Sequence, residues 1–138
     1  MTSAIANMLS SIRNASLVGK ESIRIGSSKL IEAITEVLYK EGYIAYYRLE
    51  SVQSPKKKAV FKSIVIGIKY DKYGVPVIRY TRCISKPSVR VYRPKNDFQK
   101  LLKERYSTLV LSTHKGVMCH LDAINIGIGG EVLFEVAC

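Results

Sequence analysis

The spacing of apolar residues changes near residue 42, and this change restricts the folds open to the chain. Segment 4–15 and the segment between Ser28 and Gly42 place apolar side chains three and four residues apart, as in helices that bury one face. A short strand is predicted between them at 21–26, and beyond residue 42 short runs rich in Val, Ile and Tyr are separated by turn residues. This order predicts an α+β fold in which the helices cover one face of an antiparallel sheet.

The second predicted helix has signals at both ends. Ser27 and Ser28 can cap its first turn, where the carboxylate of Glu32 suits the helix dipole. Lys40 lies in the last turn, and Gly42 is well placed to end the helix. The predicted apolar face consists of Leu30, Ile31, Ile34, Val37 and Leu38.

The predicted strands fall into two groups. In the first group, segments 43–53, 59–70 and 75–84 form a meander, joined by a basic turn at 54–58 and a second turn at 71–74. The second group builds a β-rich lobe from these elements in order: strand 88–92, a short helix capped by Asn96, strand 107–111, strand 116–119, a short helix near 121–125 and strand 131–137.

We therefore expect two small lobes. The N-terminal lobe, residues 1–72, has helices packed on a short antiparallel sheet, and the C-terminal lobe, residues 73–138, is β-rich. A chain of 138 residues is long enough to bury a hydrophobic core in such an arrangement.

Net charge indicates the class of partner. The chain has 22 Lys and Arg against 11 Asp and Glu, a formal net charge of +11, which favours nucleic acid or an anionic membrane surface. No apolar run approaches the roughly 18 residues that a membrane-spanning helix needs. The predicted helices also lack the Lys/Arg-rich face of interfacial helices. Nucleic acid is therefore the expected partner, and no membrane contact is expected.

The positive charge is concentrated in mid-chain. Residues 48–105 hold sixteen basic and four acidic side chains, whereas residues 106–138 hold one basic and three acidic. Phosphate contacts are therefore expected in mid-chain, and the turn with Lys56, Lys57 and Lys58 should set the non-specific affinity. A nucleic-acid contact in the last third must use hydroxyls, backbone amides and stacking instead.

The segment Ser112-Thr113-His114-Lys115-Gly116 lies between two apolar strands. A plain hairpin turn requires only the glycine. The alternative is RNA contact, because exposed hydroxyls can recognise base edges or 2′-hydroxyls and the His114 ring can stack on a base. The spacing leaves both explanations open.

Two further motifs have the same two explanations. The run from Gly127 through Gly129 and Gly130 to Glu131 is either a tight turn or backbone that lies close to a nucleic-acid strand. It lacks the G-x-G-x-x-G spacing of a dinucleotide fingerprint. The segment from Lys86 to Tyr92 alternates basic or polar with apolar residues, which places Ser88, Arg90 and Tyr92 on one face of a strand. This face is either solvated or one that pairs phosphates and stacks bases.

Neither a metal site nor a catalytic site is expected. Cys83, Cys119 and Cys138 are an odd number at wide spacings, so they form neither a disulfide framework nor a C-x-x-C metal motif. Cys119 and His120 are adjacent, but the sequence shows no catalytic triad and no carboxylate pair. We expect no enzymatic activity, no cofactor and no small-molecule substrate.

Four segments in one order closely resemble the S-eight family, the eighth protein of the small ribosomal subunit. These segments are Ile5–Ala15, Ile84–Tyr92, Leu111–Met118 and Gly127–Leu133, and they extend over nearly the whole chain. The resemblance implies a two-lobed α+β protein without enzymatic activity. It also implies binding to a helix in the central domain of small-subunit rRNA, and a role in subunit assembly beside neighbouring ribosomal proteins.

The resemblance further implies a set of contact residues. In the family, a Ser-Thr-Ser-Lys-Gly loop and a Gly-Gly-Glu turn meet in the C-terminal lobe and grip an irregular part of the RNA helix. The matching positions here are Ser112, Thr113, Lys115, Gly116, Gly129, Gly130 and Glu131, with Tyr92 nearby. Arg13 and Asn14 of the opening segment are included in the expected interface. Glu131, an anion, is expected to orient the loop or to accept from a base amine.

The chain also departs from the family. His114 replaces the third loop residue, usually Ser, segment 119–125 replaces a usually charged stretch, and Ala137-Cys138 replaces a usually aromatic end. These departures favour an organellar ribosome, mitochondrial before plastid. The N-terminus shows no Arg/Ser-rich transit peptide, which would then indicate synthesis within the organelle.

The competing class is a free nucleic-acid-binding regulator or an RNA-modifying enzyme. An enzyme would need a convergent set of titratable groups, and none is visible in the sequence. A free regulator would need affinity without neighbours in a subunit. Sedimentation of the native protein, in ribosomal particles or free, separates these classes.

Overall fold

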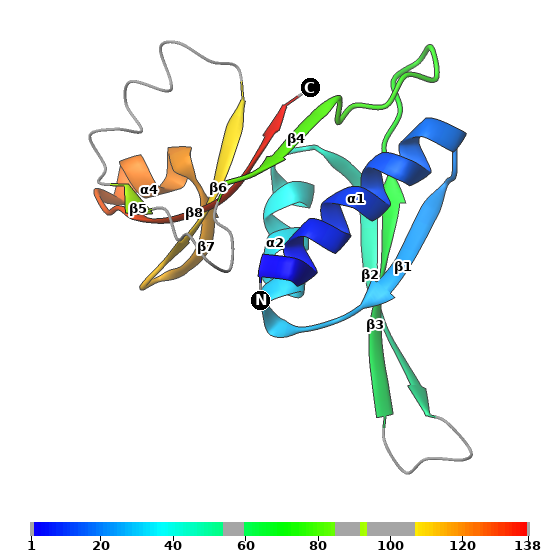
Figure 1. Ribbon diagram of the computed structural model, residues 1–138, viewed down its shortest axis with the longest axis horizontal. Coiled ribbons are helices and arrows are strands. Elements are labelled where there is room, and N and C mark those ends of the chain that lie inside the picture. The colour runs from blue at the N-terminus through cyan, green and yellow to red at the C-terminus, as the bar shows by residue number, and fades with distance from the viewer. Residues whose placement is uncertain (1, 54–59, 85–91, 94–106, 138) are drawn as a thin grey trace. The chain divides into compact units, whose positions relative to one another are not determined.

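The computed structural model describes residues 2–53, 60–84, 92–93 and 107–137 (Figure 1). They contain α-helices and two antiparallel sheets, which confirms the predicted α+β class. No helix in these residues is long and apolar enough to cross a membrane.

The chain divides into two compact units. One unit consists of residues 10–77, and the other combines residues 1–9 with residues 78–138. The boundary between two lobes that we predicted at residues 72 and 73 stays a prediction.

The unit of residues 10–77 holds a three-stranded antiparallel sheet. Strand β3 lies in its centre, in the order β1-β3-β2, and α2 lies beside β2 (Figure 1). Buried side chains of β3, Ile64 and Ile66, and of α2, Ile34 and Leu38, belong to its core. The elements are the second half of α1 (Thr2–Val18), then β1 (Ser22–Gly26), α2 (Lys29–Lys40), β2 (Ile44–Gln53) and β3 (Val60–Ile68).

Both ends of α2 form as predicted. The hydroxyl of the N-cap residue Ser28 accepts a hydrogen bond of 3.2 Å from the backbone N–H of Ile31. At the other end Gly42 has a φ of +80°, and the N–H of Tyr43 donates to the carbonyl of Leu38 at 2.9 Å. This is a Schellman motif, which a glycine enters without steric cost. Local sequence signals therefore determine this helix.

Helix α1 is longer than the predicted segment 4–15. It begins at Thr2 and continues to Val18.

The predicted meander is wrong in its third strand. Instead of a strand over 75–84, the structure has β4 (Tyr80–Cys83), which pairs with β8 (Gly130–Ala137) in the other sheet. Strand β1 occupies the second edge of β3. After the turn only an isolated bridge joins Tyr70 to Pro76, because proline has no N–H with which to continue a ladder.

The C-terminal unit contains a five-stranded antiparallel sheet. The strand order is β4-β8-β6-β7, and β5 also pairs with β8. The remaining elements are β5 (Tyr92–Arg93), β6 (Thr108–Thr113), β7 (Gly116–Cys119) and α4 (His120–Ile126). A core beneath them consists of Leu109, Leu111, Met118, Ala123 and Val132.

These elements confirm most of the predicted β-rich lobe. The predicted strands 107–111, 116–119 and 131–137 and the helix near 121–125 all form, with ends shifted by one or two residues. The predicted helix that starts at Asn96 lies outside the described residues.

Candidate nucleic-acid interface

A tight turn joins β6 to β7 and carries the predicted loop contacts. Thr113 and Gly116 pair with each other across the hairpin, and His114 and Lys115 are exposed between them. Gly116 has a φ of +113°, whereas both residues before it have negative φ. Negative φ at both central residues excludes the type I′ and II′ turns that are commonest in two-residue hairpins. The turn therefore projects an imidazole and an ammonium group into solvent.

The hydroxyl of Thr113 holds this turn together. Its Oγ1 donates to the carbonyl of Gly116 at 2.8 Å and accepts from the N–H of Lys115 at 3.2 Å. The only hydrogen of this hydroxyl is thus used inside the hairpin. The hydroxyl of Ser112, which is half-buried at the end of β6, has no hydrogen-bond partner among the described residues. Of the two hydroxyls, only that of Ser112 is free to donate to a ligand.

The two C-terminal motifs meet in space, as the resemblance implies. Ser112 pairs with Glu131 across the β6–β8 ladder. Beside this pair, a Cβ atom on Gly130 would lie 2.5 Å from the carbonyl oxygen of Ser112. Only a residue without a side chain allows backbones to approach so closely. The hairpin turn and the start of β8 therefore form one continuous surface.

Strand β5 extends this surface on the other side of β8. Tyr92 pairs with Glu131, and Arg93 pairs with Gly130. Glu131 consequently lies between Ser112 on one neighbouring strand and Tyr92 on the other. The structure thus brings together three predicted sites that are separated by about twenty residues of sequence from one to the next.

The structure describes only some of the other predicted contact residues. Arg13 and Asn14 are exposed on α1, in the unit of residues 10–77. The remaining predicted basic and polar contacts lie outside the described residues: Lys56, Lys57, Lys58, Lys86, Ser88 and Arg90. These assignments stay predictions.

Some mid-chain cations are engaged within the protein. The Nε of Arg48 lies 3.1 Å from a carboxylate oxygen of Glu50. A guanidinium nitrogen of Arg82 lies 3.2 Å from the carboxylate of Glu135, which is only 3% exposed. The basic count of residues 48–105 therefore overstates the charge available to phosphate.

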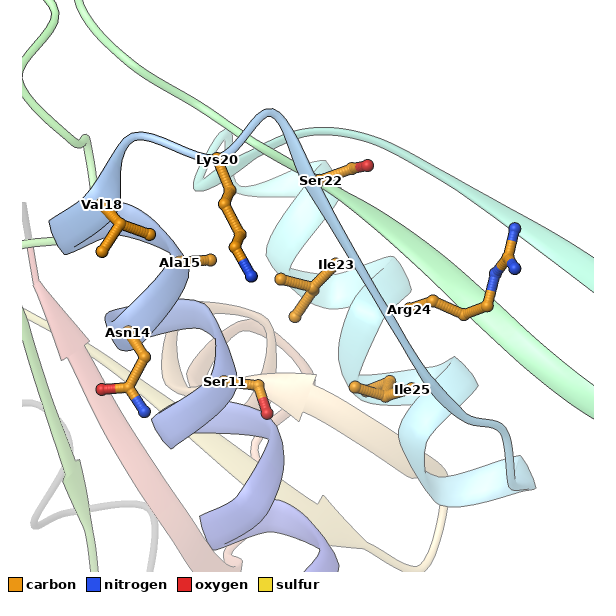
Figure 2. A pocket seen from close by; sticks show the side chains of 9 residues that line it. All are labelled: Ser11, Asn14, Ala15, Val18, Lys20, Ser22, Ile23, Arg24 and Ile25. Atoms are coloured by element: carbon orange, nitrogen blue, oxygen red, sulfur yellow. The ribbon is translucent and has the colours of Figure 1, made fainter.

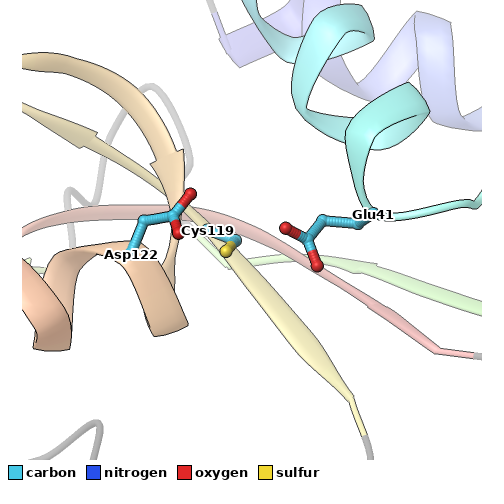
Figure 3. Close-up of side chains that lie close together, drawn as sticks. All are labelled: Glu41, Cys119 and Asp122. Atoms are coloured by element: carbon cyan, nitrogen blue, oxygen red, sulfur yellow. The ribbon is translucent and has the colours of Figure 1, made fainter.

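The segment that departs most from the family forms the start of α4. Figure 3 shows Cys119 at the end of β7 and Asp122 in the first turn of α4. Between them His120 is 3% exposed, and its Nδ1 accepts a hydrogen bond of 3.1 Å from the backbone N–H of Leu109. His120 therefore joins α4 to β6, a structural role that the sequence did not reveal, because its partner lies eleven residues away.

Comparison with known proteins decides the family. The family described as Ribosomal protein S8 matches residues 3–137 of this chain. The chain belongs to the ribosomal protein S8 family. It is 39% identical over 135 residues to the Small ribosomal subunit protein uS8 of a Nitratiruptor species, with 96% of each chain covered.

Further S8-family relatives show the same full-length similarity. The protein of the same name from Legionella pneumophila (strain Lens) is 39% identical over 137 residues, which cover 99% of this chain and 98% of the relative. That of Nautilia profundicola is 38% identical over 136 residues, with the same coverage. These relatives are bacterial, so they give no support to the expected mitochondrial origin.

Proposed function

We propose that this S8-family chain is a structural constituent of the small ribosomal subunit that binds small-subunit rRNA through its C-terminal unit. We further propose that the RNA is a helix of the central domain. The observation that carries this proposal is the contact between Ser112 and Gly130, since it joins the two family motifs into one surface. Tyr92 borders that surface through its pairing with Glu131.

Recognition on this surface depends on polar groups more than on charge. Lys115 is the single basic residue between 106 and 138, and it is exposed at the tip of the hairpin. The Ser112 hydroxyl is the donor for a base edge or a 2′-hydroxyl, and the exposed His114 ring can stack on an unpaired base. Glu131 orients the loop or accepts from a base amine. Such contacts suit an irregular RNA helix, in which bases are accessible.

Charge on other segments supplies affinity without sequence preference. We propose that Lys56, Lys57 and Lys58 contact phosphates and that the segment with Lys86 and Arg90 does the same. Each phosphate that a cation neutralises releases counterions, so this part of the affinity falls as salt rises. Specific and non-specific binding can therefore be separated by experiment.

The biological setting follows from the family. The S8 family is a structural ribosomal family, which agrees with the expectation that the chain is not an enzyme. Its partners in this proposal are the rRNA and neighbouring small-subunit proteins. A mitochondrial ribosome stays a prediction that rests on the departures at His114 and in segment 119–125.

Two measurements test the proposal. Filter binding at matched salt should show that the purified chain prefers a central-domain helix to a scrambled RNA of equal length. Gradient sedimentation of native extract should place the chain with small-subunit particles. Equal affinity for the two RNAs would contradict the proposed recognition, and sedimentation as a free protein would contradict the proposed role.

A further inference from the structure

A second polar site lies in the unit of residues 10–77, between α1 and β1. It is a pocket of about 590 Å³ (Figure 2). Ser11 and Asn14 line it from α1, and Ile23 and Ile25 line it from β1. Lys20, in the connection between the two elements, completes the lining and points its ammonium group into the pocket. All of these residues come from one short stretch of sequence.

The backbone of Lys20 is held in place on both sides. Gly19 ends α1 with a φ of +73°, and the N–H of Lys20 donates to the carbonyl of Ala15 at 3.0 Å. The hydroxyl of Tyr70 donates to the carbonyl of Lys20 at 2.6 Å. Because the N–H and the carbonyl of this lysine are both hydrogen-bonded, its backbone is held at the edge of the pocket. Such preorganisation lowers the entropic cost of binding.

The charge in the pocket is positive and partly free. No acidic side chain lines it. Arg24 also lines the pocket, but its guanidinium lies 2.8 Å from the carboxylate of Glu50. Within the described part of the chain, the side chains of Lys20, Ser11 and Asn14 have neither an ion pair nor a hydrogen bond. One ammonium, one amide and one hydroxyl therefore line the same pocket without a partner among the described residues, and these are donor types that bind phosphate.

The pocket is larger than a bare phosphate requires and has an apolar part. Its volume falls within the range of about 300–1,000 Å³ that is usual for small organic ligands. Ile23 and Ile25 form one apolar wall, and Val18 at the rim is 70% exposed. An exposed valine beside half-buried isoleucines offers a surface to a ribose or a base. The neighbouring Arg13 is exposed on α1 and adds positive charge outside the pocket.

We propose that this pocket holds one nucleotide of an RNA strand, as a site separate from the C-terminal surface. Lys20, Asn14 and Ser11 bind the phosphate, and Ile23 and Val18 contact the ribose or base. The proposal rests on the proposed function only in that the strand belongs to rRNA. A free nucleotide offers the same phosphate chemistry, so the test must distinguish the two sources.

The test uses the full-length chain and the variant Lys20→Met, which keeps the apolar stem and removes the charge. Lys29→Met is the matched control, because Lys29 is also exposed in this unit but does not line the pocket. Binding to a small-subunit rRNA transcript is measured over a range of salt. Loss of one phosphate contact should lower the slope of log K against log salt by roughly 0.7–0.9. The affinity should fall about tenfold, as expected for one charge-assisted hydrogen bond.

The outcomes separate the possible ligands. A smaller slope and weaker rRNA binding in Lys20→Met, but not in Lys29→Met, support the proposal. Equal behaviour of the two variants overturns it. A parallel titration with adenosine 5′-monophosphate, followed by amide NMR shifts around the pocket, tests the free nucleotide. Shifts that need Lys20 without any change in rRNA binding would assign the pocket to a free nucleotide and also overturn the proposal.

The same titrations distinguish failure of this proposal from failure of the proposed function. The proposed function fails if the wild-type chain prefers no central-domain helix over scrambled RNA. The pocket proposal fails if Lys20→Met leaves the salt slope unchanged on the rRNA transcript. Asn14→Ala provides a second variant of the pocket without a change in charge, and it should weaken rRNA binding at an unchanged salt slope.

Discussion

Gly130 lies against Ser112 with no room for a side chain between them. A Cβ atom on Gly130 would stand 2.5 Å from the carbonyl oxygen of Ser112 and 2.9 Å from the Cγ2 of Thr113. The sequence suggested that this glycine is constrained by its own backbone geometry or by close approach of RNA. The structure shows that a neighbouring strand of the protein already excludes a larger residue, so the glycine is needed for the fold.

Gly130→Ala should therefore lower the stability of the folded chain itself, in the absence of RNA. Forcing an extra methyl group into such a contact typically costs about 1–3 kcal/mol in the free energy of unfolding. Urea denaturation measures this loss as a lower midpoint at a constant slope. Gly26→Ala is the matched control, because Gly26 is also in a strand and a Cβ atom there would meet nothing within 4 Å. Equal midpoints for the two variants would contradict the steric argument.

Ser112→Ala should reduce specific RNA binding. If the Ser112 hydroxyl bonds a base edge or a 2′-hydroxyl, its removal leaves an unpaired polar group, at a cost of about 1–3 kcal/mol. The affinity for the central-domain helix should then fall roughly 5- to 150-fold, while binding to an unrelated duplex stays nearly unchanged. Filter binding at matched salt measures both values. Ser51→Ala, at an exposed position of β2, should change neither value.

His114 gives a separate test because it departs from the family. If its exposed ring stacks on a base, His114→Ala should weaken binding to the central-domain helix roughly 5- to 150-fold, as stacking contributes about 1–3 kcal/mol per base. His114→Ser restores the usual family residue and should retain binding through the hydroxyl. Losses that are equal on cognate and scrambled RNA, or no loss on either, would show that His114 carries no specificity.

The triple variant of Lys56, Lys57 and Lys58 to Ala should flatten the salt dependence of RNA binding. Each lost phosphate contact should lower the slope of log K against log salt by roughly 0.7–0.9. Its effect should be similar for cognate and scrambled RNA, because phosphates carry no sequence information. A slope equal to that of the wild type would mean that this turn faces solvent or protein.

Much of the fold could be predicted because its signals are local. The cap at Ser28, the glycine at Gly42 and the apolar face between them determine α2 within a dozen residues, and the structure confirms each of them. Strands β6, β7 and β8 were predicted for the same reason, since alternation and turn residues act over short distances. The family could also be recognised, because its motifs are short contiguous segments.

Strand partners could not be predicted, because pairing joins residues that are distant in sequence. Segment 75–84 has the composition of a third meander strand, yet β1 takes its place beside β3 and β4 pairs with β8. A ladder depends on which edges are free and on a donor at each position, and the proline at 76 removes one such donor. The proline is visible in the sequence, but only the fold decides which strand edges are free.

The residues of the candidate interface were all visible in the sequence, but their roles were not. The sequence by itself determined that two polar motifs and a tyrosine occur among apolar strands and that they match one family. Only the tertiary structure decided that Thr113 closes the turn, that Ser112 keeps its hydroxyl free and that Glu131 lies between Ser112 and Tyr92. Hydrogen-bond partners and strand register depend on which residues come together when the chain folds. The order of neighbouring residues in the sequence does not specify this.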